Sequence, residues 1–394
     1  MKGNLVTNAV RGQASALFPI LGNMLALKFQ SLDILRMAFQ TGLDVLLSAR
    51  RSLLKGKRVG LLAHPASVDA KGVHSSQRLR EALGKNLVAL FGPEHGYFGA
   101  GGAGEIIRDG KHPAWGIPIH SLYGDQRKPT PEMFKNLDVL IFDLQDISVR
   151  CYTFVSTLRY VMEACAEHGK TLIVCDRPIP FPNTIDGPML DPKFESFVAM
   201  VNFPLVYGMT PAESASYLNH NLNHNLHLIL SKMRGWTRSE TRPAFPWIPP
   251  SPGIRSWETA WCYPATVWAE ALTAIDIGRG GPTPFQVVTA PWLDAEKTAA
   301  KLNARKLTGV NFQPYWGKHP GIRLVVTNPR AIQPVTVGLE IVRALGKKAW
   351  TGAREDWFDK LAGTDRLRLA LKAGRRWTWS HKAFLRERSN HLLY

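Results

Sequence analysis

The sequence predicts an α/β protein with a Rossmann-like parallel-sheet domain, a second α/β domain after it, and an active-site cleft between the two. The length of 394 residues suggests two domains at about 150 residues per domain. After residue 42, short runs of Val, Ile and Leu alternate with helical patterns, as in parallel strands that are buried on both faces. The second half of the chain is more mixed. We therefore expect an N-terminal extension at 1–41, the Rossmann-like domain at 42–192 and a C-terminal α/β domain with a basic tail at 193–394.

The predicted elements of the first domain alternate along the chain. Strands are expected at 58–62, 87–91, 118–122, 139–142 and 172–175. Helices are expected near 75–83 and around 153–168. Ligands of such sheets bind beyond the carboxyl ends of the strands, so the residues directly after each strand are candidates for chemistry.

The second domain has fewer regular patterns. Thr210, with Glu213 three positions later, forms a capping-box pattern that predicts the start of a helix. A stretch rich in Pro, Trp and Gly covers 243–284, and a strand at 322–326 and a helix at 335–345 follow. We expect the long loops of this domain to line the cleft together with the first domain.

The positive charge is concentrated near the C terminus. The chain has 49 Lys and Arg against 31 Asp and Glu, a net charge of +18. This excess favours anionic partners such as nucleic acid, a membrane surface or acidic wall polymers. A nucleic-acid module is the weakest of these, since no recognised binding motif accompanies the charge.

Two tryptophans, Trp377 and Trp379, stand among the basic residues of the tail. The eight basic residues around them are Arg366, Arg368, Lys372, Arg375, Arg376, Lys382, Arg386 and Arg388. We expect this region to hold the protein on anionic wall polymers. The alternative is a solvated helix face followed by a frayed tail.

Cysteine usage and hydrophobicity exclude further classes of protein. The four cysteines form no CxxC pair and lie in apolar runs, so we expect no disulfide scaffold, no metal site and no other cofactor. No run of 18 apolar residues exists, and a transmembrane segment is therefore not expected. The apolar stretch at 14–27 resembles a signal sequence, but Pro19 and Gly22 interrupt it and no cleavage site follows. The compartment stays open: cytoplasmic without a signal, periplasmic or extracellular if residues 1–27 are an atypical one.

Two short motifs carry little weight. They are a GxGxxG pattern at Gly99, Gly101 and Gly104 and a histidine spacing at His220, His224 and His227. The glycines do not directly follow a strand and leave no room for the helix that dinucleotide binding requires. The histidines lack the Glu of an HExxH metal site. GxSxG and P-loop motifs are absent from the sequence, which argues against a standard serine hydrolase or nucleotidase.

Acidic residues at the ends of predicted strands are the main candidates for catalysis. Glu94 and His95 follow the second strand in the motif GPEHG, and a Glu in a partly apolar cleft acquires the raised pKa that a general acid requires. Asp143 and Asp146 follow the fourth strand, and Asp176 follows the fifth. A solvated turn or a helix cap is the alternative at each place. Three acid-bearing strand ends in one sheet nevertheless exceed what capping alone predicts.

The second domain offers residue types that suit carbohydrate. The loop at 249–252 leads through Trp261 and Tyr263 to Glu270. Sugar CH faces pack on aromatic rings while hydroxyl groups bond to carboxylates, although packing in the core is the alternative for these aromatic residues. Arg279 lies in the flexible turn GRGG, where it can meet a substrate carboxylate.

Taken together, the motifs are specific enough to suggest a family. In chain order they are GLDVLLSARRSLLKGKRVGLL, ALFGPEHG, IPIHSLYGDQRKPTPEM, DVLIFDLQDISVRCYTF, VCDRP, DGPML, YGMTPAE, PWIPPSP, ETAWCYPAT, GRGG with PF, and FDKLAGTDRLRLAL. This pattern resembles the NamZ-like exo-β-N-acetylmuramidases, a bacterial family formerly known as a domain of unknown function. The resemblance covers almost the whole chain beyond the extension. It implies a Rossmann-like domain and a second α/β domain with the active site between them, and release of terminal N-acetylmuramic acid from the non-reducing end of peptidoglycan fragments in cell-wall turnover or recycling.

The resemblance also implies site residues. Glu94 matches the family's catalytic glutamate. Further motif positions that are expected to line the site are His95, Tyr123, Asp143, Gln145, Asp146, Arg150, Tyr152, Asp176 and Arg177. The chain departs from the family pattern at Ile179, Gly253, Thr283 and Gln286.

Two functional hypotheses follow. The first is a glycoside hydrolase in which Glu94 donates the proton and a second acid, Asp143 or Asp146, acts as base, nucleophile or a group that orients the substrate's acetamido group. The second is a non-catalytic saccharide-binding protein with a degenerate site, which the departures motivate. Retention of the three acidic residues favours the hydrolase. In either case three arginines, Arg150, Arg177 and Arg279, are candidates for binding the lactyl carboxylate of muramic acid.

Overall fold

The computed structural model describes residues 39–102, 104–221, 225–242 and 246–394. Within this part, Gln40–Tyr394 belong to one unit. Nearly all of the expected N-terminal extension lies outside the described residues, including the stretch at 14–27. His224 and the first residues of the 243–284 stretch also lie outside them.

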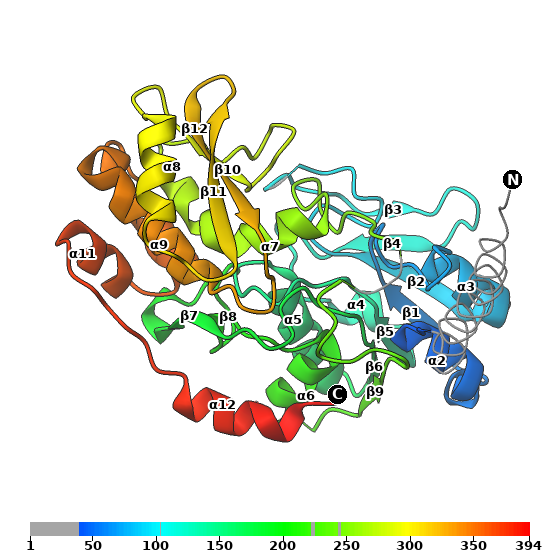
Figure 1. Cartoon of the computed structure of the whole chain (residues 1–394). Coiled ribbons are helices and arrows are strands. Elements are labelled where there is room, and N and C mark those ends of the chain that lie inside the picture. Colours follow the sequence, from blue (N-terminus) through cyan, green and yellow to red (C-terminus); the bar gives the residue numbers. More distant parts are fainter. Residues whose placement is uncertain (1–38, 103, 222–224, 243–245) are drawn as a thin grey trace, which may run out of the picture. The chain divides into compact units, whose positions relative to one another are not determined.

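A seven-stranded sheet forms the framework of the first half (Figure 1). In spatial order its strands are β3 (Gly110–Lys111), β4 (Pro118–Ser121), β2 (Leu87–Gly92), β1 (Val59–Leu62), β5 (Val139–Phe142), β6 (Thr171–Cys175) and β9 (Leu228–Ser231). Strand β3 runs antiparallel to β4, whereas all other neighbours are parallel. The chain extends the sheet from β1 toward β4 and then returns to the other side of β1, which creates the topological switch at which such sheets bind ligands.

Both faces of this sheet are buried, which explains the continuous apolar runs in its strands. Leu61 packs with the core on one side and the adjacent Leu62 with the core on the other. The helices α2 (Gly42–Ala49) and α3 (Ser75–Leu83) contribute to the first core. The second core lies against α4 (Pro131–Phe134), α5 (Phe154–Glu167) and α6 (Pro211–Asn221). Parallel sheets require this two-sided cover.

The second half adds a smaller mixed α/β layer. Its antiparallel sheet has the order β10 (Val287–Thr289), β12 (Pro320–Val326) and β11 (Val310–Trp316). The helices around it are α7 (Trp257–Thr266), α8 (Ala295–Asn303), α9 (Pro334–Leu345), α10 (Glu355–Ala362) and α11 (Arg366–Lys372). A further, two-stranded sheet pairs β7 (Asp186–Met189) with β8 (Pro204–Val206). The predicted fold class, a Rossmann-like parallel sheet followed by a second α/β domain, is confirmed.

The domain boundaries remain predictions, but two structural facts bear on them. Strand β9 pairs with β6, so residues beyond 192 complete the first sheet. One continuous hydrophobic core also includes Phe142 from that sheet and Leu324 from the smaller one. The two halves therefore share buried surface instead of meeting only through a linker.

The C-terminal tail is packed, so the frayed-tail alternative is wrong. Helix α12 (Lys382–Arg388) lies beside α6, where Phe384 meets Tyr217 with ring centroids 5.6 Å apart (Figure 1). Arg388 is buried and donates hydrogen bonds to the carbonyls of Pro182 and Gly208 at 2.9 and 2.6 Å. The Tyr394 hydroxyl donates to Asp176 at 2.8 Å. In the described part of the chain, no helix is both long and apolar enough to cross a membrane.

Candidate active site

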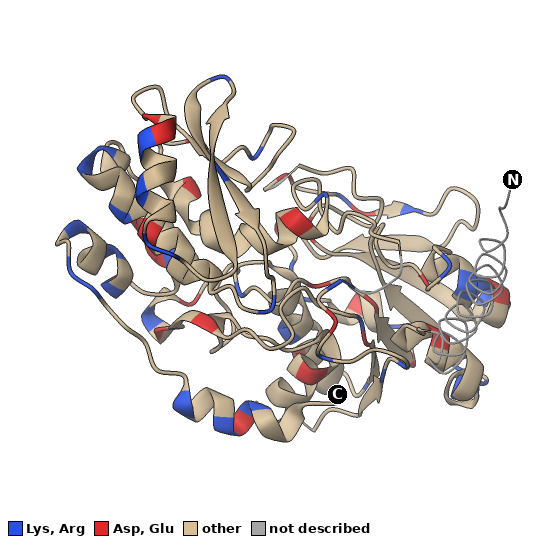
Figure 2. Ribbon diagram, in the orientation of Figure 1, with Lys and Arg blue, Asp and Glu red and all other residues tan. Residues whose placement is uncertain are grey.

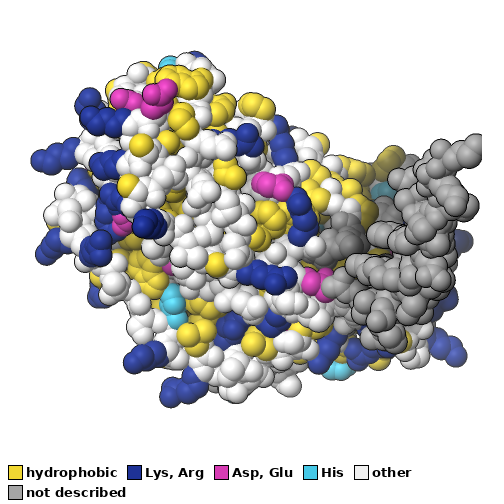
Figure 3. Space-filling view, viewed as in Figure 1, with side chains coloured by type: hydrophobic (Ala, Val, Ile, Leu, Met, Phe, Trp, Pro, Cys, Tyr) yellow, Lys and Arg dark blue, Asp and Glu magenta, His cyan; other side chains and the backbone are white. Residues whose placement is uncertain are grey.

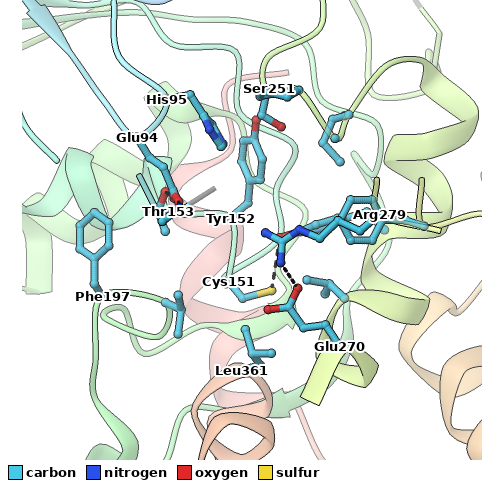
Figure 4. Close-up of a pocket in the computed structure, with 18 of the residues that line it drawn as sticks. Glu94, His95, Cys151, Tyr152, Thr153, Phe197, Ser251, Glu270, Arg279 and Leu361 are labelled. Atoms are coloured by element: carbon cyan, nitrogen blue, oxygen red, sulfur yellow. Dashed lines mark hydrogen bonds and ion pairs between the residues drawn. The ribbon is translucent and has the colours of Figure 1, made fainter. Parts of the chain in front are cut away.

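A pocket of about 670 Å³ opens beyond the carboxyl ends of β2, β4 and β5 (Figure 4). The loops after these strands supply one wall, and segments between Ser251 and Leu361 supply the other. The predicted site residues that line it are Glu94, His95, Tyr123, Tyr152, Glu270 and Arg279. The pocket thus lies in the cleft between the two α/β regions, as the topology predicts.

The backbone of the GPEHG turn explains which residue types stand on either side of Glu94. A Cβ atom on Gly92 would lie 2.3 Å from the Tyr97 nitrogen, so only glycine fits there. His95 and Gly96 both adopt positive φ, at 73° and 79°. The imidazole Nδ1 of His95 lies 3.0 Å from the Gly101 carbonyl, which supports the strained turn. The result is a fixed backbone that presents Glu94 to the pocket.

Three donors hold the Glu94 carboxyl group. The Thr153 hydroxyl donates to Oε2 at 2.6 Å, and the Gly104 amide donates to Oε1 at 3.4 Å. Tyr123 also hydrogen-bonds to Glu94. Burial and the nearby Glu94 charge raise the pKa of Tyr123 to about 12, so its hydroxyl stays protonated at neutral pH. These contacts fix one carboxyl group at the pocket surface, as a proton donor to a substrate oxygen requires.

Tyr152 and Cys151 form the deeper part of the wall. Burial raises the pKa of Tyr152 well above its usual value, and the ring packs edge-on against Tyr263 with centroids 5.9 Å apart. Its hydroxyl end points toward Ser251 (Figure 4). Burial also raises the pKa of the Cys151 thiol to about 12, so this cysteine carries no thiolate for nucleophilic catalysis at neutral pH.

Glu270 and Arg279 form an ion pair on the opposite wall. Glu270 lies on the 3₁₀ helix η4 (Val267–Ala271), and its Oε2 is 2.6 Å from a guanidinium nitrogen of Arg279. The indole N–H of Trp357 donates to the other oxygen at 2.8 Å. Both Glu270 oxygens are therefore engaged. The Arg279 side chain is 47% exposed, so the rest of its guanidinium can bind a substrate carboxylate.

Several residues that line the pocket were not predicted from the sequence. Arg127 stacks over Phe197, with its guanidinium carbon 4.5 Å from the ring centroid, and its buried Nε has no hydrogen-bond partner among the described residues. It stands four residues after Tyr123 in the segment SLYGDQRKP, which was a signal that could have identified it. Thr153 also lies within a motif of the family pattern, DVLIFDLQDISVRCYTF. Trp357 had no comparable signal, because only packing of α10 against η4 brings it to the pocket.

Asp143 and Arg177 are not part of the pocket lining. Arg177 binds both Asp143 oxygens, at 2.6 and 2.9 Å, and both side chains are 0% exposed. Arg177 also donates to the carbonyls of Ala66 and Val68. In the structure this pair fixes the turn after β1, and the substrate contacts expected of both residues stay a prediction.

Asp146 and Gln145 lie behind the pocket wall. Asp146 accepts hydrogen bonds from the Tyr207 hydroxyl and the Ile147 amide, and burial raises its pKa to about 6. Gln145 donates to the carbonyls of Asp146 and Pro178. Neither side chain lines the pocket, so the catalytic role that we expected for Asp146 gains no geometric support.

Arg150 and Asp176 likewise serve the interior. The Arg150 guanidinium is 0% exposed and donates to the carbonyls of Pro188, Phe203 and Ala362. Asp176 accepts hydrogen bonds from Thr210, Ala212 and Tyr394 at the start of α6. These polar groups satisfy buried backbone or a helix start, and the substrate contacts expected of both residues stay a prediction.

The departures from the family pattern lie mostly outside the pocket. Ile179 is 0% exposed, and buried Gln286 donates to Thr259 at 3.0 Å. Gly253 does line the pocket, where a Cβ atom would lie 3.0 Å from the Phe285 ring. Trp261 is buried on α7, which favours core packing for that residue.

The weaker motifs gain no support from the fold. The glycines Gly99, Gly101 and Gly104 belong to a loop in which the Gly104 amide contacts Glu94. Among the described residues, no group of three or more His, Cys, Asp or Glu side chains is arranged to hold a metal ion.

Comparisons with known proteins agree with this arrangement. The family model for the N-terminal part of the exo-beta-N-acetylmuramidase NamZ matches residues 59–258, and that for its C-terminal part matches residues 261–394. The chain belongs to the NamZ family. The predicted family is thus confirmed. A curated member, the peptidoglycan beta-N-acetylmuramidase NamZ of Bacillus subtilis strain 168, is 38% identical over 353 residues, which cover 85% of this chain and 84% of that protein.

Two solved structures of DUF1343 family proteins from Bacteroides fragilis share the fold of this NamZ family chain. The first has a TM-score of 0.84 at 34% identity and covers 91% of this chain and 100% of its own. The second has a TM-score of 0.72 at 25% identity and covers 91% and 99%. The fold of both halves therefore recurs in the solved structures.

Proposed function

We propose that this chain is an exo-β-N-acetylmuramidase that releases terminal N-acetylmuramic acid from the non-reducing end of peptidoglycan fragments in wall turnover. Membership of the NamZ family supports the activity. The observation that carries the proposal is Glu94, which is held by Thr153, Tyr123 and the Gly104 amide at a pocket of sugar-binding size.

Glu94 serves as the general acid. Its carboxyl group protonates the glycosidic oxygen as the bond to the muramic acid C1 breaks. The hydrogen bonds from Thr153 and Gly104 position the carboxyl group before the substrate arrives. Cleavage of this bond also requires a group that stabilises C1 from the other face of the sugar.

We infer that the substrate's own acetamido oxygen supplies that stabilisation. Among the described residues that line the pocket, the carboxylates are Glu94 and Glu270, and both oxygens of Glu270 are engaged by Arg279 and Trp357. Asp143 and Asp146 are enclosed in the interior. Substrate assistance needs no second carboxylate nucleophile. A thiazoline analogue of N-acetylmuramic acid, which mimics the cyclised acetamido intermediate, should therefore inhibit the enzyme competitively.

The pocket also suits the acidic lactyl group of muramic acid. Five basic side chains line it, namely Arg127, Arg255, Arg279, Arg354 and Lys360. Arg279 and Arg127 are the best placed, because one retains exposed N–H groups and the other has an unpartnered Nε. Arginine binds a carboxylate through paired hydrogen bonds.

The decisive experiment is incubation with a chromogenic N-acetylmuramide. Release of the chromophore by the wild-type chain, and its loss in Glu94→Gln, is the expected result. The alternative of a non-catalytic saccharide-binding protein, which the pocket departure at Gly253 favours, predicts binding of the sugar without release by either form.

We also propose that basic residues of the C-terminal segment hold the chain on anionic wall polymers. Arg368, Lys372 and Arg388 are engaged internally. The other exposed members of the predicted set are Arg366, Arg375, Arg376, Lys382 and Arg386. Adhesion through exposed charges weakens as salt rises, because the Debye length is about 8 to 10 Å at physiological salt.

A further inference from the structure

A second cavity, of about 900 Å³, shares no lining residue with the active-site pocket. One wall is a face of α9 formed by Thr336, Leu339, Glu340 and Arg343, which follow helical spacing. The other wall is the segment 374–381, which connects α11 to α12. We name this cavity the arginine–tryptophan groove after the side chains described below.

Three guanidinium groups gather in the arginine–tryptophan groove. Arg305 and Arg343 both bind Glu340, which is only 9% exposed. Arg376 is exposed and forms no ion pair with any described side chain. Within this cluster, the Glu340 carboxylate therefore faces the guanidinium groups of three arginines. Burial lowers the pKa of both Arg305 and Arg343, and the neighbouring Arg376 lowers them further.

A second carboxylate of the groove, that of Asp186, offsets part of this excess, so three guanidinium groups face two carboxylates. Asp186 accepts hydrogen bonds from the Val335 amide and from the amide and hydroxyl of Thr336, so its carboxylate serves the start of α9. The His381 ring nitrogen lies 2.7 Å from the Gly187 carbonyl. The groove thus keeps unbalanced positive charge, which an anionic ligand would neutralise.

Two indole rings form the aromatic wall of the groove. Trp377 and Trp379 are half-buried, and their ring centroids lie 5.9 Å apart at an interplanar angle of 74°. Both also line an adjoining hollow of about 380 Å³, which contains Arg366. The neighbouring polar groups of Gln333 and Thr378 can bond to hydroxyl groups.

We propose that the arginine–tryptophan groove is a second, non-catalytic binding site for an acidic glycan strand, namely the alternating N-acetylglucosamine and N-acetylmuramic acid chain whose end the active site cleaves. The identity of this glycan rests on the proposed function. Indole faces pack against pyranose rings, while Arg376 and Arg343 meet the lactyl carboxylates. A polyol phosphate chain would satisfy the arginines but has no sugar ring in its backbone for the two tryptophans.

The charge distribution agrees with a glycan that approaches from this side. Figure 2 shows blue segments along α9, which lines the groove, and along its neighbours α8 and α11. In Figure 3, dark blue side chains gather at the same edge of the molecule, with few magenta ones among them. A bound strand would keep the enzyme near further chain ends without contacting the reacting bond.

The test is titration calorimetry on the full chain carrying Glu94→Gln, which prevents turnover. The ligand is an alternating glycan oligosaccharide with N-acetylglucosamine at its non-reducing end, so that it presents no terminal muramic acid to the active site. We expect Arg376→Ala to weaken binding roughly tenfold, the usual loss for a hydrogen bond to a charged group. Arg330→Ala is the control, because Arg330 is an exposed arginine that neither lines the groove nor belongs to the basic C-terminal set. It should change the affinity less than twofold.

Trp379→Ala tests the aromatic wall and should weaken binding of the acidic glycan. A neutral chitin oligosaccharide should bind at least tenfold more weakly than the acidic glycan. Equal losses in Arg376→Ala and Arg330→Ala would overturn the proposal, since they indicate diffuse charge attraction. Absence of binding by the acidic glycan, or tighter binding of poly(glycerol phosphate), would overturn it as well. If the wild-type chain binds this glycan but releases no chromophore from a muramide, the proposed activity fails while the groove stands.

Discussion

Thr153→Val tests whether the hydroxyl that contacts Glu94 positions the catalytic carboxyl group. Thr153 is the N-cap residue of α5, yet its side chain makes no capping hydrogen bond. Its hydroxyl donates instead to Glu94 Oε2 at 2.6 Å. Valine has nearly the same shape, so the substitution removes this one donor and leaves the contacts from Gly104 and Tyr123 in place.

The structure sets the expected magnitude. A hydrogen bond to a charged group contributes about 1.5 to 3 kcal/mol, which corresponds to a loss of roughly 10- to 100-fold in kcat/KM if the transition state requires this geometry. Loss of a true N-cap would cost about 1 kcal/mol of stability, but no such cap exists here. We therefore expect a fall in kcat with little change in KM, and a Tm within about 2 °C of the wild type.

Steady-state kinetics on a chromogenic muramide measure the effect. Thr153→Ser keeps the hydroxyl and should restore most of the activity. Thr157→Val is the matched control, because that hydroxyl donates to the Thr153 carbonyl one turn into α5 and does not line the pocket. Activity of Thr153→Val within twofold of the wild type would refute the positioning role.

Three further predictions concern the acids and the cations. Glu94→Gln should lower kcat by about 10² to 10⁴ while circular dichroism stays unchanged, and full turnover would eliminate Glu94 as the acid. Arg279→Ala should reduce the ratio of kcat/KM for a muramide to that for an N-acetylglucosaminide roughly fivefold to tenfold, since this arginine is half exposed; an unchanged ratio would exclude it as the lactyl contact. Asp146→Asn should keep muramidase activity and flatten the pH dependence of Tm between about pH 4 and 6. The pKa of Asp146 is about 6 in the folded protein and about 3.9 in the unfolded chain, so the native state keeps this proton up to a higher pH. The free energy of unfolding of the wild type therefore falls as pH rises through this window. Loss of activity in Asp146→Asn would restore its catalytic assignment.

The sequence predicted the parallel sheet well because strands buried on both faces have a continuous apolar pattern. Strand β5 was predicted at its observed bounds, and α5 to within one residue at each end. Strand β3 consists of only two residues, Gly110 and Lys111, and both are exposed. Its sequence therefore carries no strand pattern. Position along the chain indicated that Glu94 follows a strand, and the structure places it in the pocket.

The burial of the acidic residues at the strand ends could not be predicted from the sequence. Asp143 and Asp176 follow strands as Glu94 does, but each meets donors from distant segments, Arg177 in one case and Tyr394 in the other. A carboxylate at a strand end can thus bind a ligand or satisfy the interior. The choice depends on which partners the tertiary fold brings close, and no local pattern encodes them.

The buried motif residues still connect to the active site through a series of contacts. Arg177 fixes the turn after β1 through the carbonyls of Ala66 and Val68. At the start of that turn, the His64 ring contacts the Pro250 carbonyl at 3.1 Å and accepts a hydrogen bond from the Gln145 amide at 2.9 Å.

Pro250 precedes Ser251 and Gly253, which line the pocket from the second half of the chain. Asp143 and Arg177 are therefore connected through this turn to the wall opposite Glu94, in the way that supporting residues hold reactive groups in a productive geometry. Burial lowers the pKa of His64 well below its usual value, so the ring stays neutral and keeps one nitrogen as an acceptor for the Gln145 amide. The motif residues that lie behind the pocket thus connect its two walls, which gives them a supporting role in a site between two α/β regions.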